Sequence, residues 1–245
     1  MIIWEGASRQ DGSPIVGIVT GIDSPSSNRK TGPMAQLWIL RADMPPLEAL
    51  RTDADAAICG DCPLRGVLDR DTGSRVGRVC YVNVGQAPTS VYRAYERGSY
   101  PRVTPDHVSS VLAHRGVSIR LGAYGDPAML PLSVITALCN GVKGTGYTHQ
   151  WRHLDRAWAA YLMASADTVS DRRDARRAGW RSFYVVPMDT DLATVPHAVE
   201  CMATRERNRL TCAQCLACSG TKGRDTVAVD VVIRAHGTGG RYVTA

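Results

Sequence analysis

Blocks of apolar and polar residues alternate along residues 82–187, and their spacing changes between the strand period and the helix period. Short runs rich in Val, Ile and Leu predict strands, and the amphipathic segments between them predict helices that end at Gly. The expected strands are residues 82–84, 117–121, 144–148, 162–166 and 182–187, and the expected helices are residues 88–97, 105–115, 131–140, 153–161 and 171–178. Thr104 and Ser170 are expected N-caps. This alternation predicts a parallel sheet with helical connections.

Flanking segments extend this pattern. Apolar runs predict further strands at residues 15–19, 36–41 and 226–235. Residues 45–51 predict a short helix. We therefore expect an α/β fold of βα repeats, a partial or complete TIM-like barrel with a C-terminal cysteine-rich module, in one domain. Its expected parts are residues 1–58 (N-terminal strands and loop), 59–200 (βα-repeat core), 201–223 (cysteine-rich metal or cluster module) and 224–245 (final strand and tail).

The composition is that of an ordinary globular protein, with 44% hydrophobic and 21% charged residues. The net charge of +6 comes almost wholly from arginine, so nucleic acid is only an alternative partner. No apolar run is long enough to span a bilayer, and the first residues do not resemble a signal peptide. We therefore expect a cytoplasmic protein with no membrane partner, in which clustered cysteines are metal or redox ligands rather than disulfides.

Seven of the eight cysteines form two groups. The members of the first group are Cys59, Cys62 and Cys80. Gly60 and Pro63 stiffen its C-x2-C turn, and the third cysteine ends a Gly- and Arg-rich excursion. Three thiolates without an obvious fourth ligand favour an iron–sulfur cluster whose open iron binds something. A closed zinc site would have to recruit a histidine or Cys139, which we expect to be a core residue.

The members of the second group are Cys201, Cys212, Cys215 and Cys218. Four thiolates complete a structural zinc site. They equally suit a [4Fe-4S] cluster, whose cysteines often occur as C-x2-C-x2-C with one distant partner. The spacing is commoner for iron–sulfur clusters, and both alternatives stay open.

Polar side chains follow several of the expected strands. Tyr147 and His149 end the strand at residues 144–148, and His236 ends the final strand. Because the carboxyl ends of the strands form the active face of a βα barrel, we expect these three residues to contact the substrate or to act in acid–base catalysis. The alternative for His149 is a hydrogen bond to a neighbouring loop.

The loop at residues 26–33 is polar and carries two adjacent cations, Arg29 and Lys30. Together with backbone amides, these cations could hold an anionic group. The loop has too few glycines for a phosphate-binding P-loop, and a solvated loop is the alternative.

The order of these motifs resembles the core of the radical S-adenosylmethionine enzymes. In that superfamily, three cysteines with an aromatic residue beside the last hold a [4Fe-4S] cluster, and S-adenosylmethionine chelates its free iron. The first cysteine group and Tyr81 match this set. The spacing differs, because the superfamily usually carries C-x3-C-x2-C on one loop.

The resemblance has further implications for the site. A Gly-Gly-Glu-Pro-like loop after the second barrel strand of the superfamily receives the methionyl amino group. Gly125 and Asp126 stand in the similar segment here, with aspartate for glutamate, and are therefore implied as cofactor-binding residues. The second cysteine group resembles the auxiliary-cluster modules of these enzymes.

A closer likeness is to a mostly phage-encoded, cysteine-rich family named after a mycobacteriophage gene product. The shared features are an Asn-x-Lys-Thr-Gly loop, a Cys-x2-Cys-Pro turn, a Cys-Tyr pair, a late run of cysteines and a final strand ending in His-Gly. The likeness implies Asn28 and Lys30 as binding residues and adds weight to His236. For a phage protein, the cytoplasm would be that of the host.

Two functions from different classes follow. The first is an iron–sulfur enzyme that cleaves S-adenosylmethionine reductively, or uses its open iron as a Lewis acid or electron donor, and takes electrons from an external donor. The second is a non-catalytic protein that binds nucleic acid or a host protein, with zinc or clusters in a structural role. The sequence does not predict the substrate.

Overall fold

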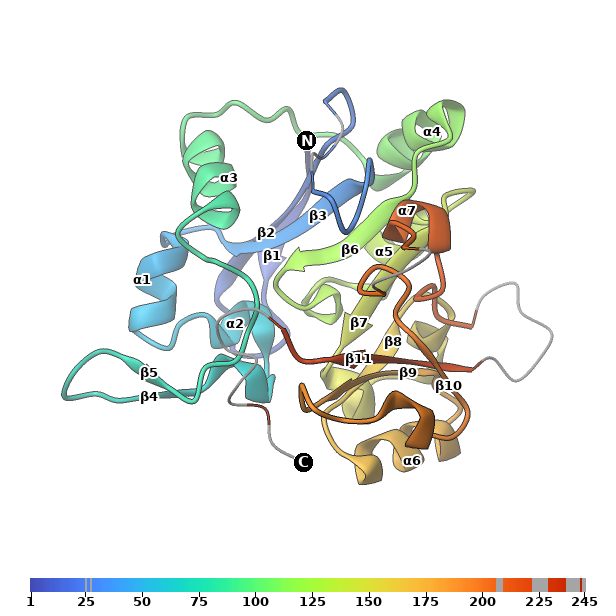
Figure 1. Cartoon of the computed structure of the whole chain (residues 1–245). Coiled ribbons are helices and arrows are strands. Elements are labelled where there is room, and N and C mark those ends of the chain that lie inside the picture. The colour runs from blue at the N-terminus through green and yellow to red at the C-terminus, as the bar shows by residue number, and fades with distance from the viewer. Residues whose placement is uncertain (25, 27, 206–208, 222–228, 237–242, 244–245) are drawn as a thin grey trace.

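The computed structural model describes all residues except 25, 27, 206–208, 222–228, 237–242 and 244–245. One twisted nine-stranded sheet runs through the molecule in the order β1-β2-β3-β6-β7-β8-β9-β11-β10 (Figure 1). Its strands are β1 (Ile2–Ala7), β2 (Pro14–Thr20), β3 (Ala35–Arg41), β6 (Ile119–Tyr124), β7 (Gly144–Thr148), β8 (Met163–Ala166), β9 (Ser182–Val186), β11 (Asp230–Arg234) and β10 (Ala198–Glu200). A separate hairpin consists of β4 (Val67–Leu68) and β5 (Arg75–Val76).

The sheet is mixed but largely parallel. β2 pairs antiparallel with β1 and with β3, and every pair from β3 onward is parallel. The predicted α/β class with a parallel sheet is therefore confirmed. In the described residues the sheet is open, because β1 and β10 form its two edges and do not pair with each other. A complete TIM-like barrel is not formed.

The helices are short, and several bounds agree with the predictions. They are α1 (Pro46–Arg51), α2 (Ala56–Cys59), α3 (Ala87–Glu96), α4 (Pro105–Arg115), α5 (Leu132–Leu138), α6 (Val169–Arg177) and α7 (Cys212–Cys215), with the 3-10 turns η1 (Pro63–Arg65), η2 (Pro127–Met129), η3 (Gln150–His153), η4 (Arg156–Ala160) and η5 (Leu192–Thr194). Thr104 caps α4 by accepting from the amide of His107, and Gly116 ends it in the left-handed conformation at φ 63°. Both termini follow from the ordinary capping preferences.

Other predicted elements differ from the structure. The helix expected at residues 153–161 is replaced by η3 and η4, because the side chain of Asp155 accepts from the amide of Ala157 and starts a new turn. α6 begins earlier than expected, since Thr168 rather than Ser170 is the N-cap and forms a capping box with Asp171. Residues 82–84 form no strand. Of the final strand predicted at residues 226–235, residues 226–228 lie outside the described part.

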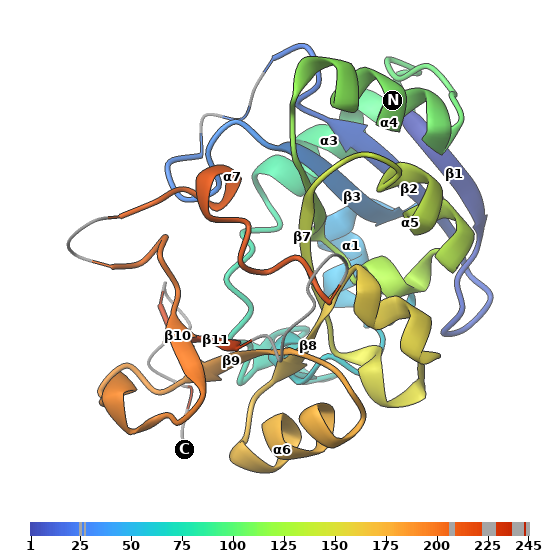
Figure 2. The same cartoon turned by 90° about the vertical axis from the view of Figure 1, so that its right-hand side faces the viewer.

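The main core lies around β3, which is buried along its whole length. α4 and α5 cover one side of the sheet, whereas α7 lies on the opposite side (Figure 2). A smaller apolar cluster joins Met163, Val231 and Cys218, with Tyr147 and Phe183 packed against it. The late cysteines are therefore anchored on the second half of the sheet. None of the helices in the described part of the chain is long and apolar enough to cross a membrane.

Candidate functional site

The first cysteine group begins at the end of α2, where the chain makes a tight turn. Gly60 has φ 55° and ψ −139°, and a Cβ atom there would lie 2.5 Å from the side-chain nitrogen of Gln150. Gln150 donates from Nε2 to the carbonyl oxygen of Cys59 at 3.4 Å. Glycine is therefore required in this turn, and the residue that starts η3 helps to fix its position.

A buried ionic network returns the chain to this turn after the excursion. Asp55 is 2% exposed and accepts from the guanidinium groups of Arg65 and Arg75, each at 2.6 Å. Asp53 pairs with the same two groups at 2.6 and 2.8 Å. Arg75 belongs to the β4–β5 hairpin, and the amide of Cys80 donates to a carbonyl of η1 at 3.0 Å. Charge pairing therefore brings the third cysteine back towards the first two.

The thiols of the first group act on one another. Burial is the main cause that holds the pKa of Cys59 well above its ordinary value, and Cys62, Asp55 and Cys80 raise it further. Burial also raises the pKa of Cys80, with a smaller contribution from Cys62. Three thiolates in one place are unfavourable without a cation among them, and metal binding relieves this cost.

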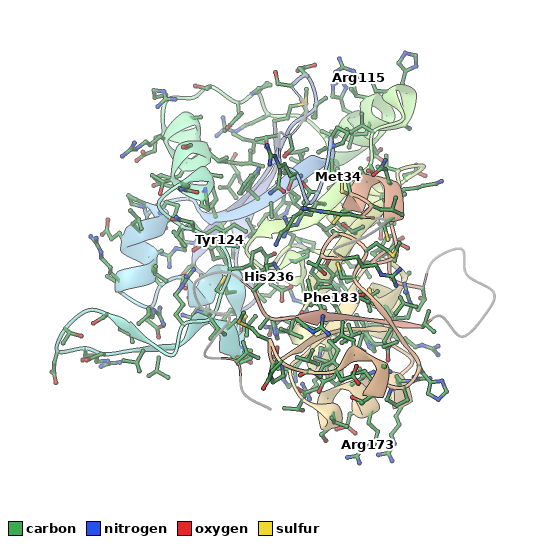
Figure 3. The ribbon with its side chains drawn as sticks, viewed as in Figure 1. Met34, Arg115, Tyr124, Arg173, Phe183 and His236 are labelled. Carbon is green, nitrogen blue, oxygen red and sulfur yellow. The ribbon has the colours of Figure 1, made fainter. Side chains whose placement is uncertain are left out.

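Tyr124 lies at the end of β6 and carries a buried hydroxyl group (Figure 3). The residue is 4% exposed, and its hydroxyl has no hydrogen-bond partner among the described residues. Burial raises its pKa well above the ordinary value, and Cys59, Asp55 and Cys80 add to the shift. An unsatisfied buried hydroxyl costs about 1–3 kcal/mol. A group bound beside these cysteines would recover part of that cost.

His149, directly after β7, lies at the same site. Its Nε2 is 3.1 Å from Oδ2 of Asp167, and the ring also hydrogen-bonds Cys62. Burial lowers the pKa of His149, but the charge of Cys62 and the hydrogen bonds with Asp167 and Cys62 outweigh it, so the pKa lies well above its ordinary value. His149 is therefore a titratable group beside Cys62, and the Asp167 carboxylate orients its ring.

Gly125 and Asp126 connect the segments that surround the first cysteine group. A Cβ atom at Gly125 would lie 2.7 Å from β3, and the Asp126 amide donates to the carbonyl of Ile58 at 2.7 Å. The buried carboxylate of Asp126 accepts from an amide of η2 at 2.9 Å, and from the Thr148 hydroxyl and the His149 amide at 3.0 Å. Burial raises its pKa in spite of these bonds. Both carboxylate oxygens are thus engaged within the protein, and binding of S-adenosylmethionine by Asp126 stays a prediction.

The second cysteine group lines one hollow of the molecule. Its four lining thiols are those of Cys201, Cys212, Cys215 and Cys218. Cys201 follows β10 and its amide donates to a carbonyl of β11 at 2.8 Å, whereas the other three lie on and after α7. The hollow has a cavity volume of about 30 Å³. Two separate segments of the chain therefore deliver all four predicted ligands to one place.

Tyr147 belongs to this second group. Its side chain hydrogen-bonds the thiol of Cys218, and its ring packs against Phe183 of β9 with 4.1 Å between the ring centroids. The amide of Gly146 donates to the carbonyl of Cys218 at 3.1 Å. Burial raises the pKa of Cys218 to about 12, although the hydrogen bond with Tyr147 opposes the shift. The predicted catalytic tyrosine thus contacts a cysteine of the second group.

The loop at residues 28–32 packs against the start of α7. The first two amides of α7 donate to the carbonyl oxygens of Lys30 and Thr31 at 2.9 and 3.0 Å. Gly32 adopts φ 70°, and a Cβ atom there would lie 2.8 Å from the hydroxyl of Thr211, the N-cap of α7. Within the loop, the Asn28 side chain accepts from the Lys30 amide at 2.9 Å. The loop is therefore a support for the second group as well as a carrier of Lys30.

Lys30 and His236 line a second hollow beside the first. The ring of His236 stacks on that of Tyr81, with centroids 6.4 Å apart and an angle of 24° between the planes. The guanidinium of Arg120 lies 5.7 Å from the Tyr81 ring centroid and hydrogen-bonds the Tyr81 hydroxyl. Because Tyr81 adjoins Cys80, this hollow connects the surroundings of both cysteine groups.

The predicted site residues are thus distributed over three neighbouring places: His149 with the first group, Tyr147 with the second, and Lys30 with His236. Cys139 is a buried core residue, as expected, at 6% exposure. Tyr124 and Asp167 also stand at the ends of expected strands, which the sequence pattern indicated, but sequence reasoning assigned neither residue a role in the site. It had no signal for the contact between His236 and Tyr81. The predicted partner of His236, Gly237, lies outside the described residues.

A single-ion site is not preformed in the described residues. They contain no group of three or more His, Cys, Asp or Glu side chains that could hold a metal ion. Zinc requires four ligand atoms at about 2.0–2.3 Å from one point. The four cysteines of the second group line a hollow instead of converging on such a point.

Comparison with known proteins gives no identification. No family model matches the chain, and neither a curated protein nor a solved structure matches it. The resemblances drawn from the motifs therefore stay predictions, and the function has to be argued from the arrangement of the residues.

Proposed function

We propose that the protein is an iron–sulfur enzyme with two cysteine-bound [4Fe-4S] clusters. The observation that supports this proposal most directly is that all four cysteines of the second group line one hollow. A cluster is larger than one ion, so its ligands surround a body instead of converging on a point. The cysteines of the second group fit such an occupant.

The residues of the first group fit a cluster that works on a substrate. Its members are Cys59, Cys62 and Cys80, and the charge of Cys62 raises the pKa of both other thiols. The unsatisfied hydroxyl of Tyr124 lies within the electrostatic reach of two of them. A buried donor without a protein partner is expected where a bound group is to be contacted.

The position of the motifs in the sheet supports a likeness to the radical S-adenosylmethionine enzymes. β3 is the first strand of the parallel part, and the Cys59 turn follows it; β6 is the second, and Gly125 follows it directly. The next parallel strands, β7 to β9, continue in chain order. This order is what the resemblance implies for a partial barrel, with the cysteine turn after the first strand and the Gly-Asp loop after the second.

The protein's own residues have separate tasks in this proposal. When bound, a cluster with an open iron supplies an electron or a Lewis-acidic position. His149 would position a proton: because the Asp167 carboxylate accepts, Nε2 carries hydrogen, which leaves Nδ1 as the second exchangeable position. Tyr147 would donate its hydroxyl hydrogen to the sulfur of Cys218, and hydrogen bonds to cluster sulfurs tune the reduction potential.

The test is the metal content of protein purified without oxygen. We expect brown protein with about eight irons and as many acid-labile sulfides per chain. Cys59→Ser should remove about half of the iron, Cys215→Ser the other half, and Cys139→Ala, as the matched control, none. Wild-type protein without iron and sulfide would contradict the proposal.

One observation favours a second candidate, a non-catalytic binding protein with structural zinc. His149 beside Cys62 would complete a Cys3His ligand set, which is a common closed zinc site. In that case the protein would be colourless and hold about two zinc ions per chain, and His149→Ala would release one of them. Iron–sulfur protein should keep its iron when His149 is replaced by alanine.

A further inference from the structure

The proposed function does not use the hollow that is lined by Lys30 and His236. We propose that it binds the phosphate group of a small phosphorylated ligand. Its polar lining consists of Lys30, Glu200, Thr204, Arg209, Arg234 and His236. It has a cavity volume of about 270 Å³ and is partly open to solvent, so it admits a ligand from outside.

The charges of the lining match a doubly charged anion. Among the described residues of this hollow, Lys30, Arg209 and Arg234 are cationic and Glu200 is the single carboxylate, which leaves a surplus of two positive charges. Glu200 is itself shared between Arg205 at 3.4 Å and Arg234 at 4.0 Å. A phosphate monoester carries a charge of about −1.5 to −2 near neutral pH, whereas a carboxylate carries only one.

The donors of the hollow are held in place by the backbone. The Nε of Arg234 donates to the carbonyl of Thr190 at 3.0 Å. The Nδ1 of His236 lies 3.1 Å from the carbonyl of Arg234; because a carbonyl only accepts, Nδ1 carries the hydrogen, and Nε2 donates to a phosphate only when the ring is protonated. The carbonyl of Lys30 is bound by the first amide of α7. Donors that are positioned before binding lose little entropy on binding.

The position of the hollow assigns it to the substrate. The loop of Lys30 supports α7, which carries the second cysteine group, and His236 stacks on Tyr81 beside Cys80 of the first. A ligand held by its phosphate would therefore extend between the two groups. The phosphate binding does not depend on which metal the cysteines hold, and only its role as a substrate site rests on the proposed function.

The experiment is calorimetric titration of the full-length protein, purified without oxygen, with inorganic phosphate at about 0.15 M salt. Lys30→Gln should weaken binding about tenfold or more, since a charged hydrogen bond is lost, and Arg209→Gln should act in the same direction. Arg29→Gln is the matched control: it is the neighbouring exposed cation and does not line the hollow, so we expect a change below about twofold. The Lys30 side chain is exposed, so its loss should leave the fold intact.

Three results would overturn the inference: no phosphate binding by the wild type, equal weakening by Lys30→Gln and Arg29→Gln, or equal binding of acetate. Tight binding of a mixed-sequence oligonucleotide at concentrations where phosphate does not bind would also overturn it, in favour of a nucleic-acid surface. Metal content measured on the same samples separates the two proposals. Colourless protein with Lys30-dependent phosphate binding would contradict the iron–sulfur function alone, and iron-rich protein without phosphate binding would contradict this inference alone.

Discussion

The two cysteine groups are assembled by different means. The second group takes three cysteines from α7 and the residues directly after it, and one from the end of the adjoining β10. The first group needs an ionic network around Asp55 to return Cys80 after a separate hairpin. The comparison teaches that the second group is held by its own short segments and by backbone contacts with the Lys30 loop, whereas the first group depends on charge pairing to return the chain after a hairpin.

The two cysteine groups also differ in the polarity of their surroundings. Cys218 lies in an apolar cluster with Met163 and Val231. The first group is surrounded by polar and charged groups, among them His149 and the unsatisfied hydroxyl of Tyr124. Apolar surroundings suit a relay or a structural cluster, and titratable neighbours suit chemistry on a substrate. The difference favours the first group as the working site.

Among the substitutions that test this comparison, removal of the Asp55 charge is expected to have the largest effect on stability. Asp55→Asn leaves the guanidinium groups of Arg65 and Arg75, which are 14% and 6% exposed, without their buried counter-charge. Breaking a buried pair from one side costs about 3–5 kcal/mol. We expect the free energy of unfolding to fall by about 3 kcal/mol in urea titrations, and iron to be lost from the first group only.

The control for this change is the neighbouring Asp53. Its carboxylate pairs with the same two arginines but is 53% exposed, so Asp53→Asn should cost below about 1 kcal/mol. The residue has φ 67°, which asparagine tolerates well. If both substitutions have equal effects, or if the second group loses iron as well, the dependence of the first group on this network is refuted.

A smaller effect is expected where the second group rests on the Lys30 loop. Gly32→Ala would place a Cβ atom 2.8 Å from the Thr211 hydroxyl at a residue with φ 70°. The left-handed conformation alone costs alanine about 1–2 kcal/mol, and separation of the loop from α7 adds to this. We expect a total loss of about 2–3 kcal/mol and lower iron occupancy of the second group.

Gly12→Ala isolates the conformational part of that loss. Gly12 has a similar φ of 77°, but a Cβ atom there would have no neighbour within 4 Å. Its replacement should cost about 1 kcal/mol and leave both groups loaded. Equal losses for the two alanine variants would mean that the contact between the loop and α7 contributes nothing.

The sequence predicted what depends on local pattern. Capping residues and hydrophobic period predicted α4 with its bounds, Thr104 and Gly116, and spacing alone identified the second group, which the structure gathers around one hollow. The pattern also predicted a parallel sheet. The pattern could not predict whether the sheet closes into a barrel, because a contact between β1 and β10 depends on the twist of the whole sheet.

The rest could not be predicted because it depends on contacts between distant segments. The partners of Asp55 lie ten and twenty residues away in the chain, and no periodicity connects them. The contact of His149 with Cys62 likewise needs β7 to lie beside the turn after α2. Tyr124 was missed because an unsatisfied hydroxyl is recognised only when its surroundings are known.

The smallest effect is expected at Asp171, which acts on the first group through Asp167. Its Oδ2 accepts from the amides of Asp167 and Thr168 at 3.1 and 3.0 Å. Burial alone would raise the pKa of Asp171, but the hydrogen bonds from Arg152 and Thr168 outweigh it and hold the pKa below 3.8. Asp171→Asn should cost about 1 kcal/mol at pH 7, whereas Asp174→Asn, on the exposed side of the same helix, should cost almost nothing.

The pH dependence of that cost tests whether the charge is its cause. A carboxyl group with a lowered pKa in the folded state stabilises the fold above its ordinary pKa of 3.8 and loses this contribution as the pH falls through the folded value. The difference in unfolding free energy between wild type and Asp171→Asn should therefore be constant near neutral pH and shrink below about pH 4.

Metal analysis of the same variant sharpens the comparison of the two groups. If Cys59, Cys62 and Cys80 alone hold the first cluster, its iron should be unchanged, because only the partner of His149 has been loosened. Loss of metal from the first group would instead identify His149 as a ligand, and would favour the closed Cys3His site over an open iron.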